Sequence, residues 1–182
     1  SVLQLQRLGL WDRAQHLPMV QKLGASFIGA ADTTEPVHFS FQEALIAKGF
    51  EAFSMERAPF DAWLLEEARD SGADVCQGSR VKRIAQLDDA GAELHTEDQT
   101  VRASMVVDAS GQATVVPRHL GTRRVIEGHG RVAYASHVRG MARAPMPLGG
   151  YTAIVMADDA WFWIIPVDEQ RTSVGVVLPA GL

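Results

Sequence analysis

The stretch DDAWFWIIPVDEQRTSVGVVLP, residues 158–179, constrains the fold of this chain more than any other part. Alternate side chains of an extended strand point to opposite faces of a sheet. The apolar side chains are Trp161, Trp163 and Ile165 on one face, and Phe162, Ile164 and Pro166 on the other. A strand with one solvated face would alternate polar and apolar residues instead. We therefore expect this strand to be buried on both faces or to form one wall of a ligand cavity.

Composition narrows the class of protein. The chain has 182 residues, 47% of them hydrophobic, which suits one globular domain or a large part of a bigger one. A net charge of −5 with interspersed signs gives no basic stripe for nucleic acid. No apolar run suits a bilayer span and no signal peptide opens the chain, so a cytoplasmic protein is expected. The single Cys76 has no disulfide partner and is expected to be buried.

The first part of the chain mixes helices and strands. Apolar spacing predicts a helix and a further short turn within residues 1–16. The expected strands are 24–30, 37–41 and 50–58, with a turn at 31–36 between the first two. Residues 59–72 predict a helix, because Pro59 stands near its start and Gly72 follows its end. The chain opens inside an amphipathic pattern and without methionine, so we expect it to be an internal segment of a longer protein.

Strands dominate the remainder. We expect a short strand at 73–79 and then a meander of 80–87, 92–97 and 100–108, whose first hairpin turns at DDAG. The last of these is apolar enough to be central in its sheet. A short helix follows within 109–121, where Pro117 is tolerable only in the first turn. From residue 123 four further strands predict an antiparallel sheet. The fold class is therefore mixed α/β.

The sequence MVVDASGQA places Asp108 at the carboxyl end of an apolar strand, followed by Ala109, Ser110 and Gly111. In open α/β sheets ligands bind beyond the carboxyl ends of the strands, and small residues admit them close to the backbone. A carboxylate there can accept hydrogen bonds from ligand hydroxyls. The alternative is an aspartate that caps the next helix, and these residues alone favour the cap slightly.

Other candidate residues have ordinary explanations too. Arg57 stands before a helix and is suited to a cofactor phosphate or ring edge, but spacing alone favours an ordinary surface pair with Asp61 or Glu56. Lys22 lies between an expected helix and a strand, where a solvated lysine is usual; a desolvated one can donate hydrogen bonds or act as a nucleophile. Gly175 within a strand indicates close approach of a neighbour, usually for packing. The six histidines lack the spacing of metal ligands, so no metal site is expected.

Four segments together resemble the flavin-dependent halogenases, a group within the FAD-dependent halogenase and monooxygenase superfamily. QKLGASF is similar to the region that carries the halogenases' active-site lysine, which falls on Lys22. MERAPFDAWLLEEARDSGADV resembles the family's Arg-x-x-Phe-Asp helix, and VVDASGQATVVPRHLG resembles its second FAD-contacting motif. WFWIIP matches the halogenase signature Trp-x-Trp-x-Ile-Pro, on Trp161, Trp163, Ile165 and Pro166. This last match is the most specific to halogenases.

The resemblance implies a fold and a division of the chain. It implies part of a Rossmann-like FAD-binding domain with a three-stranded meander, and an antiparallel substrate-domain sheet. Residues 1–56 would be a substrate-domain segment with the active site, 57–122 part of the FAD-binding domain, and 123–182 the substrate-domain sheet. The FAD-binding residues would be Arg57, Asp108, Ala109 and Gly111. The tryptophan strand would line the tunnel that joins flavin and substrate.

The resemblance also implies a reaction. A flavin hydroperoxide would oxidise chloride or bromide, and Lys22 would pass the halogen to an electron-rich aromatic substrate, free or tethered to a carrier protein. A separate flavin reductase would supply FADH2. The usual glycine before the signature is Ala160 here, a mild change. The family's upstream Gly-x-Gly-x-x-Gly and its downstream halide-binding motif are both absent, so the segment alone is expected to be inactive. A hydroxylase or prenyl reductase of the same superfamily, or a non-catalytic binding module, stays as an alternative.

Overall fold

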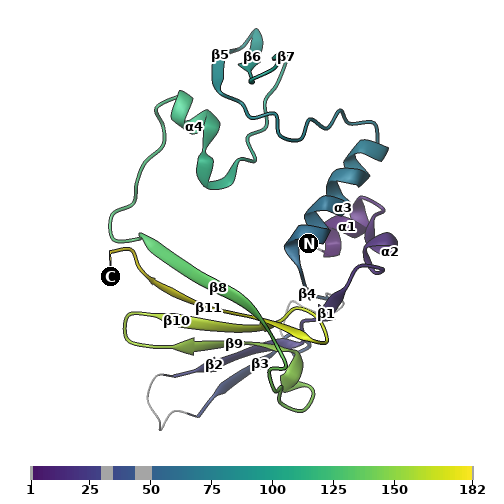
Figure 1. Cartoon of the computed structure of the whole chain (residues 1–182), viewed down its shortest axis with the longest axis vertical. Helices are drawn as coiled ribbons and strands as arrows, with labels where there is room; N and C mark the ends of the chain where they lie inside the picture. The colour runs from purple at the N-terminus through teal and green to yellow at the C-terminus, as the bar shows by residue number, and fades with distance from the viewer. Residues whose placement is uncertain (1, 30–34, 44–50, 182) are drawn as a thin grey trace. The chain divides into compact units, whose positions relative to one another are not determined.

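The computed structural model describes residues 2–29, 35–43 and 51–181. The chain divides into two compact units, one formed by 1–67 with 128–182 and the other by 68–127 (Figure 1). Most of the predicted turn at 31–36 lies outside the described residues. The two units are described separately below.

The first unit opens with two short helices, as predicted, and contains most of a third. These are α1 (Val2–Arg7), α2 (Trp11–Ala14) and α3 (Arg57–Asp70). Leu5 of α1 and Ala14 of α2 are buried. The ring of Trp11 lies 5.3 Å from that of Phe53. The opening of the chain is therefore held by apolar contacts as well as by the ion pair of Arg13 with Glu67.

Helix α3 confirms the predicted start and stop signals. Pro59 is its third residue, inside the first turn, where a missing N–H costs no intrahelical hydrogen bond. The rings of Phe60 and Trp63 lie 5.8 Å apart on its half-buried stripe. Gly72 follows with a φ of +93°, a left-handed conformation that ends a helix without strain only in glycine.

The main sheet of this unit has six strands in the order β3-β2-β9-β10-β11-β8 (Figure 1). Their bounds are β2 (Gly24–Ile28), β3 (Val37–Ser40), β8 (Arg131–Arg139), β9 (Tyr151–Met156), β10 (Trp161–Pro166) and β11 (Arg171–Pro179). All neighbouring pairs are antiparallel except β2 with β9, which is parallel. The predicted antiparallel strands are present, but local sequence patterns gave no sign that the N-terminal hairpin joins them through a parallel pair.

Two very short strands flank strands β2 and β3 in the sequence, one before β2 and one after β3. They are β1 (Met19–Gln21) and β4 (Phe53–Met55), which pair antiparallel. The strand predicted at 50–58 is shorter than expected, because α3 already begins at Arg57. Lys22 extends this pairing by donating its backbone N–H to the carbonyl of Ala52 at 2.7 Å. The pairing fixes the backbone of Lys22 directly before β2.

Register places the tryptophan strand at the middle of the sheet. Trp163 of β10 lies opposite Gly175 of β11, and Ile165 lies opposite Ser173, which in turn faces His137 of β8. The start of β10 is partly solvated: Trp161 is 36% exposed and Phe162 42%. Complete burial of both faces, one of the two predicted options, is therefore wrong for this chain, and the cavity option is taken up below.

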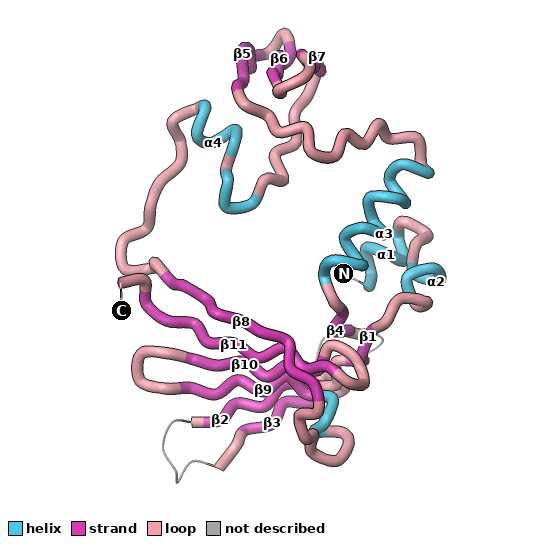
Figure 2. The backbone as a smooth tube through the Cα atoms, viewed as in Figure 1, coloured by secondary structure: helices cyan, strands magenta, loops and turns pink. Residues whose placement is uncertain are grey.

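The second unit carries the predicted meander and the short helix that follows it (Figure 2). The meander consists of β5 (Arg83–Asp88), β6 (Gly91–His95) and β7 (Thr100–Ala103), paired in that order. Asp88 Oδ1 accepts a hydrogen bond from the Ala90 N–H at 2.9 Å, which closes the predicted hairpin turn. After it come the 3₁₀ turn η1 (Gly111–Ala113) and α4 (Val115–His119). Pro117 is the third residue of α4, as predicted.

Two predictions for this unit are wrong. Residues 73–79 form no strand, and Cys76 is exposed rather than buried. The strand predicted at 100–108 ends at Ala103, and beyond it Met105 and Val107 are 78% and 84% exposed. Within the described residues no neighbouring strand pairs with either segment. A strand needs a hydrogen-bonded partner, so apolar composition alone did not form one here.

Within residues 2–29, 35–43 and 51–181, no helix combines the length and the apolar character that crossing a bilayer demands. Over the same residues, no group of three or more His, Cys, Asp or Glu side chains is arranged to hold a metal ion.

Candidate active site

A cavity of about 630 Å³ in the first unit brings Lys22 together with the tryptophan strand. Its polar lining consists of Lys22, Ser54, Glu56, Arg57, His137 and Ser173. Aromatic and aliphatic side chains form most of the remaining wall, and Ile165 of β10 is one of them. Three residues singled out by the sequence, Lys22, Arg57 and Ile165, therefore line one space. Apolar walls with a few convergent polar groups are typical of small-molecule sites.

Lys22 is positioned between two strands, not at the end of a helix as its sequence context indicated. Its residue is half-buried, and its backbone is held by the hydrogen bond to Ala52. Among the described residues no carboxylate forms an ion pair with its ammonium group. A solvated lysine that only interacts with the end of a helix would be exposed. The geometry instead gives a hydrogen-bond donor with a point charge at the wall of a cavity.

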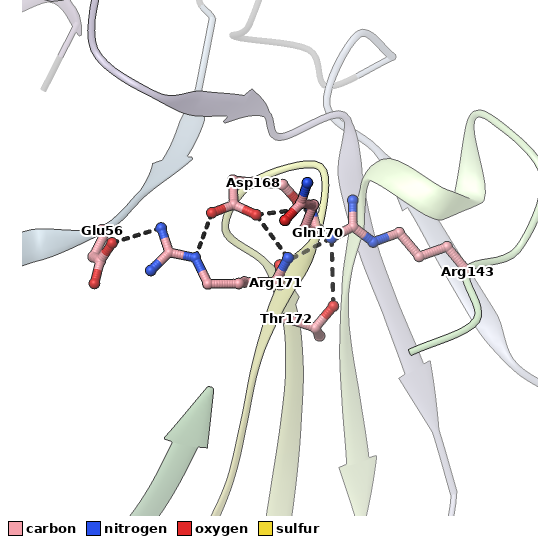
Figure 3. A network of polar contacts seen from close by, with 6 residues as sticks. All are labelled: Glu56, Arg143, Asp168, Gln170, Arg171 and Thr172. Atoms are coloured by element: carbon pink, nitrogen blue, oxygen red, sulfur yellow. Dashed lines mark hydrogen bonds and ion pairs between the residues drawn. The ribbon is translucent and has the colours of Figure 1, made fainter. Parts of the chain in front are cut away.

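The carboxylate of Glu56 also lines the cavity, and Arg171 engages it. Arg171 Nη2 lies 2.7 Å from Glu56 Oε2, while its Nε donates to Asp168 Oδ2 at 2.5 Å (Figure 3). Arg143 Nη2 donates in turn to the carbonyl oxygens of Asp168 and Arg171. The Glu56 carboxylate in the cavity wall is thus paired with Arg171, the first residue of β11.

The pKa of Asp168 reflects this network. Burial of its carboxylate raises the pKa, but hydrogen bonds from the Arg171 side chain and from the backbone of Arg171 and Gln170 outweigh it. The balance lowers the pKa from 3.8 to about 2. Because the folded-state pKa is depressed, the network stabilises the fold above about pH 4. That contribution is lost as the pH falls from there through about 2.

Asp168→Asn is expected to lower the free energy of unfolding at neutral pH by about 1–2 kcal/mol, discounting for a side chain that is 21% exposed. The loss should shrink as the pH falls from 4 toward 2. Urea unfolding across this pH range measures both effects. Glu169→Gln, in the same turn, is the control and should leave stability within about 0.5 kcal/mol of wild type. Equal losses from both variants would contradict the role of the network.

Arg57 has the partner that the sequence allowed as its ordinary explanation. Its Nε and Nη2 donate to Asp61 Oδ1 and Oδ2, both at 3.0 Å, in a two-pronged pair one helical turn apart. Hydrogen bonding to Asp61 and its charge raise the pKa of the guanidinium. The pair is exposed, so it contributes little to stability.

The four signature residues do not share one environment. Ile165 lines the Lys22 cavity, and Trp161 and Trp163 lie farther along the same face with ring centroids 5.9 Å apart. Pro166 is buried on the opposite face, in a separate hollow of about 260 Å³ that also contains Ser26 and His38. The signature is thus a structural strand with one residue at the cavity.

In the second unit Asp108 adopts the capping arrangement that its neighbours favoured. Its Oδ1 accepts from the Ser110 N–H and its Oδ2 from the Val116 N–H, both at 2.8 Å. Ser110 Oγ accepts from the Val115 N–H at 3.1 Å. The pKa of Asp108 is lowered, first by hydrogen bonding to the Ser110 side chain and then by these backbone groups. The carboxylate is held ionised at the start of α4.

The same turn keeps room for a ligand's hydroxyl groups. Each carboxylate oxygen has two lone pairs, so Asp108 can accept further hydrogen bonds beside its cap. No atom of the described residues lies within 4 Å of the position that a Cβ on Gly111 would occupy, and Ala109 is exposed. Thr114 has a φ of +47°, rare for a β-branched residue, and its buried Oγ1 has no partner in the described part of the chain. Backbone strain and an orphaned buried hydroxyl thus occur together at Thr114.

Sequence reasoning gave no site role to four polar residues of the cavity, Ser54, Glu56, His137 and Ser173. The last two enter it because they are paired across β11 and β8, beside Ile165. Their own strands alternate only weakly in polarity, so no local pattern marks them. Register between strands far apart in sequence was needed to find them, and no spacing rule supplies it.

Comparison with known proteins gives a family and several relatives. The tryptophan halogenase family model matches residues 4–180. A brominase of 1H-pyrrole-2-carbonyl on a peptidyl-carrier protein, from Pseudoalteromonas luteoviolacea, is 29% identical over 98% of this chain. The chain spans 43% of that brominase's length.

Solved structures of similar fold include halogenases and another flavoprotein. The crystal structure of CmlS, a flavin-dependent halogenase, has a TM-score of 0.81 and 30% identity, over 96% of this chain and 32% of CmlS. A flavoprotein/dehydrogenase from Cytophaga hutchinsonii has the same TM-score with 26% identity, over 98% of this chain and 44% of that protein. The mixed α/β fold predicted from sequence is therefore confirmed. Because the family model covers nearly all of this chain, the chain belongs to the tryptophan halogenase family.

Proposed function

We propose that this chain is part of an FAD-dependent halogenase that oxidises halide and halogenates an electron-rich aromatic substrate through Lys22. One observation carries the proposal: a half-buried lysine, without an ion pair among the described residues, lines the same cavity as Ile165 of the tryptophan strand. Family membership supports the reaction class.

The proposal assigns the chain to the middle of a longer protein, since it spans less than half of the brominase and of CmlS. Residues 57–122 would belong to a Rossmann-like FAD-binding domain, and 1–56 with 123–182 to the substrate domain. The exposed apolar residues Met105 and Val107 support this, because they have the sequence pattern of a strand, and a strand needs neighbouring strands to pair with. This chain alone would then be inactive.

Reduced FAD, when bound, supplies two electrons to oxygen, so that one oxygen atom leaves as water and the other joins oxidised halide as hypohalous acid. The chain's own residues would confine and direct that oxidant. The Lys22 ammonium donates a hydrogen bond to its oxygen, or the neutral amine takes the halogen as a haloamine and releases water. In both cases an electron-rich ring carbon receives the halogen and loses its proton. That proton joins the hydroxide left by the hypohalous acid to form water, or it restores the free amine from the haloamine.

The remaining candidate residues would hold the cofactor. Asp108 would accept hydrogen bonds from flavin-chain hydroxyls, while Ala109 and Gly111 admit the ligand to the backbone. Arg57 would contact FAD at the rim of the Lys22 cavity, with Asp61 fixing its guanidinium plane. The mostly apolar cavity wall would exclude water, which otherwise consumes the oxidant.

Partners follow from the same reaction. Chloride or bromide is the co-substrate, and a separate reductase would supply FADH2. The relative named for a carrier-bound pyrrole supports a small aromatic substrate tethered to a carrier protein, although a free substrate fits the cavity equally. We place the whole protein in the cytoplasm, where reductase and carrier are accessible.

A second candidate is an FAD-dependent hydroxylase or prenyl reductase. The fold of the Cytophaga hutchinsonii flavoprotein/dehydrogenase matches this chain as well as the fold of CmlS does, and this match favours the second candidate. Its tryptophans would line an apolar substrate pocket instead of a halide route. The identity of the product separates the two candidates.

The flavin part of the proposal is tested by titrating the full-length protein with FAD and following flavin fluorescence. Saturable binding is expected, and Asp108→Asn should weaken it by about 10-fold through loss of charge-assisted hydrogen bonds. Asp98→Asn, on the exposed meander turn, is the matched control and should bind as wild type does. Failure of the wild-type protein to bind FAD would favour a non-catalytic binding module and sink the proposal.

A further inference from the structure

Trp163 is tied to the Lys22 cavity through a single hydrogen bond. Its indole Nε1 donates to Ser173 Oγ at 3.0 Å. Ser173 lines the cavity beside Ile165 and His137, whereas Trp163 itself does not. The hydrogen bond to Ser173 is therefore a direct contact between this tryptophan and the cavity wall.

The indole is fixed on two sides, which in turn fixes Ser173. Its ring lies directly over Gly175, where an added Cβ would be 2.2 Å from Cζ2. The ring of Trp161 packs beside it, with centroids 5.9 Å apart. Because the ring cannot shift toward β11, its N–H stays aimed at Ser173 Oγ.

This hydrogen bond decides what the serine can do. An indole N–H is only a donor, so Ser173 Oγ must accept, and its own hydroxyl proton remains available. Among the described residues Ser173 Oγ has no other hydrogen-bond partner. The residue is half-buried at the cavity wall, so the cavity is where its O–H finds an acceptor.

We infer that Ser173 is a second hydrogen-bond donor beside Lys22, which holds the oxygen of the hypohalous acid, and that Trp163 is the positioning residue that orients it. The inference rests on the proposed function and deepens it. Two donors in one apolar-walled cavity, one charged and one neutral, suit a small acceptor bearing partial negative charge.

The test is a double-mutant cycle in the full-length protein with FAD, a reductase and bromide. Ser173→Ala and Trp163→Phe should each lower the bromination yield per oxygen consumed by about 10-fold, the effect of one oriented hydrogen bond. The missing yield should appear as hypobromous acid in a soluble trap. The double variant should be no worse than Ser173→Ala alone. Ser173→Thr, which keeps the hydroxyl, should restore most of the yield.

A matched control comes from the same sheet. Ser136 lies on the opposite face of β8, away from the Lys22 cavity, so Ser136→Ala should retain the wild-type yield. A second readout needs no activity: in ¹H–¹⁵N spectra Ser173→Ala should shift the Trp163 indole resonance and accelerate its exchange with solvent.

The outcomes separate the inference from the function. Additive losses from Trp163→Phe and Ser173→Ala, no rescue by threonine, or an unchanged Trp163 indole resonance would overturn the inference while bromination by the wild type stands. A wild-type protein that binds FAD yet brominates nothing would refute the proposed function, and the inference with it.

Discussion

Lys22→Ala is expected to lower halogenated product by at least about 10²–10³-fold in the full-length protein, while reduced flavin still consumes oxygen. The reason is geometric. Lys22 is the cavity's half-buried ammonium, and the nearby Glu56 is already paired with Arg171. Product yield and oxygen uptake, measured together, separate loss of transfer from loss of flavin chemistry.

Lys22→Arg sharpens this test. Arginine keeps the positive charge and donors but cannot act as a neutral amine. Retained halogenation in Lys22→Arg would favour hydrogen bonding to the oxidant, whereas complete loss would favour a haloamine. Lys82→Ala, which removes a surface lysine paired with Glu97, is the control and should be neutral. Wild-type halogenation by Lys22→Ala would contradict the assignment of the lysine.

Gly175→Ala is expected to destabilise the first unit by about 1–3 kcal/mol, the usual cost of forcing a methyl group into a packed site. In a strand, alanine would otherwise be favoured over glycine by roughly 0.5–1 kcal/mol. Here the new Cβ would lie 2.2 Å from Cζ2 and 2.4 Å from Cη2 of Trp163, a rigid ring. The clash therefore decides the sign. Urea unfolding with tryptophan fluorescence measures both the stability and the displaced indole.

A compensating substitution checks the cause of that loss. Trp163→Val in the Gly175→Ala background removes the ring and should make the alanine neutral or slightly stabilising relative to Trp163→Val alone. If alanine costs as much with valine at 163 as with tryptophan, the clash with the ring is not the cause. Unchanged stability and emission in Gly175→Ala would contradict the packing itself.

Features set by neighbouring residues were predictable from the sequence. Pro59 and Gly72 fixed the ends of α3, and the DDAG turn fixed the first hairpin of the meander, because capping and turn geometry depend on a few adjacent residues. The resemblance that points to Lys22 is likewise local, and the role that it implies stays a prediction. The surroundings of Lys22 could not be predicted locally, since β1 pairs with a strand more than thirty residues away.

Features set by distant pairing were not predictable. The parallel pair of β2 with β9 and the approach of Ser173 to Trp163 depend on register across the sheet. Apolar composition failed in the opposite way at residues 104–108, where a strand was predicted from its side chains but has no partner within the described structure. Asp108 shows a third limit: capping and ligand binding use the same carboxylate, so its pattern alone favours neither strongly.

The most direct measurement of the central claim is the identity of the product made by the full-length protein from reduced FAD, oxygen, bromide and an electron-rich pyrrole or phenol. Both the free substrate and its carrier-protein thioester should be supplied, and the products identified by mass spectrometry. The account predicts a product with the isotope doublet of one bromine, dependent on bromide and lost in Lys22→Ala. A product that gains oxygen or hydride instead, with no bromine at any bromide concentration, would contradict it.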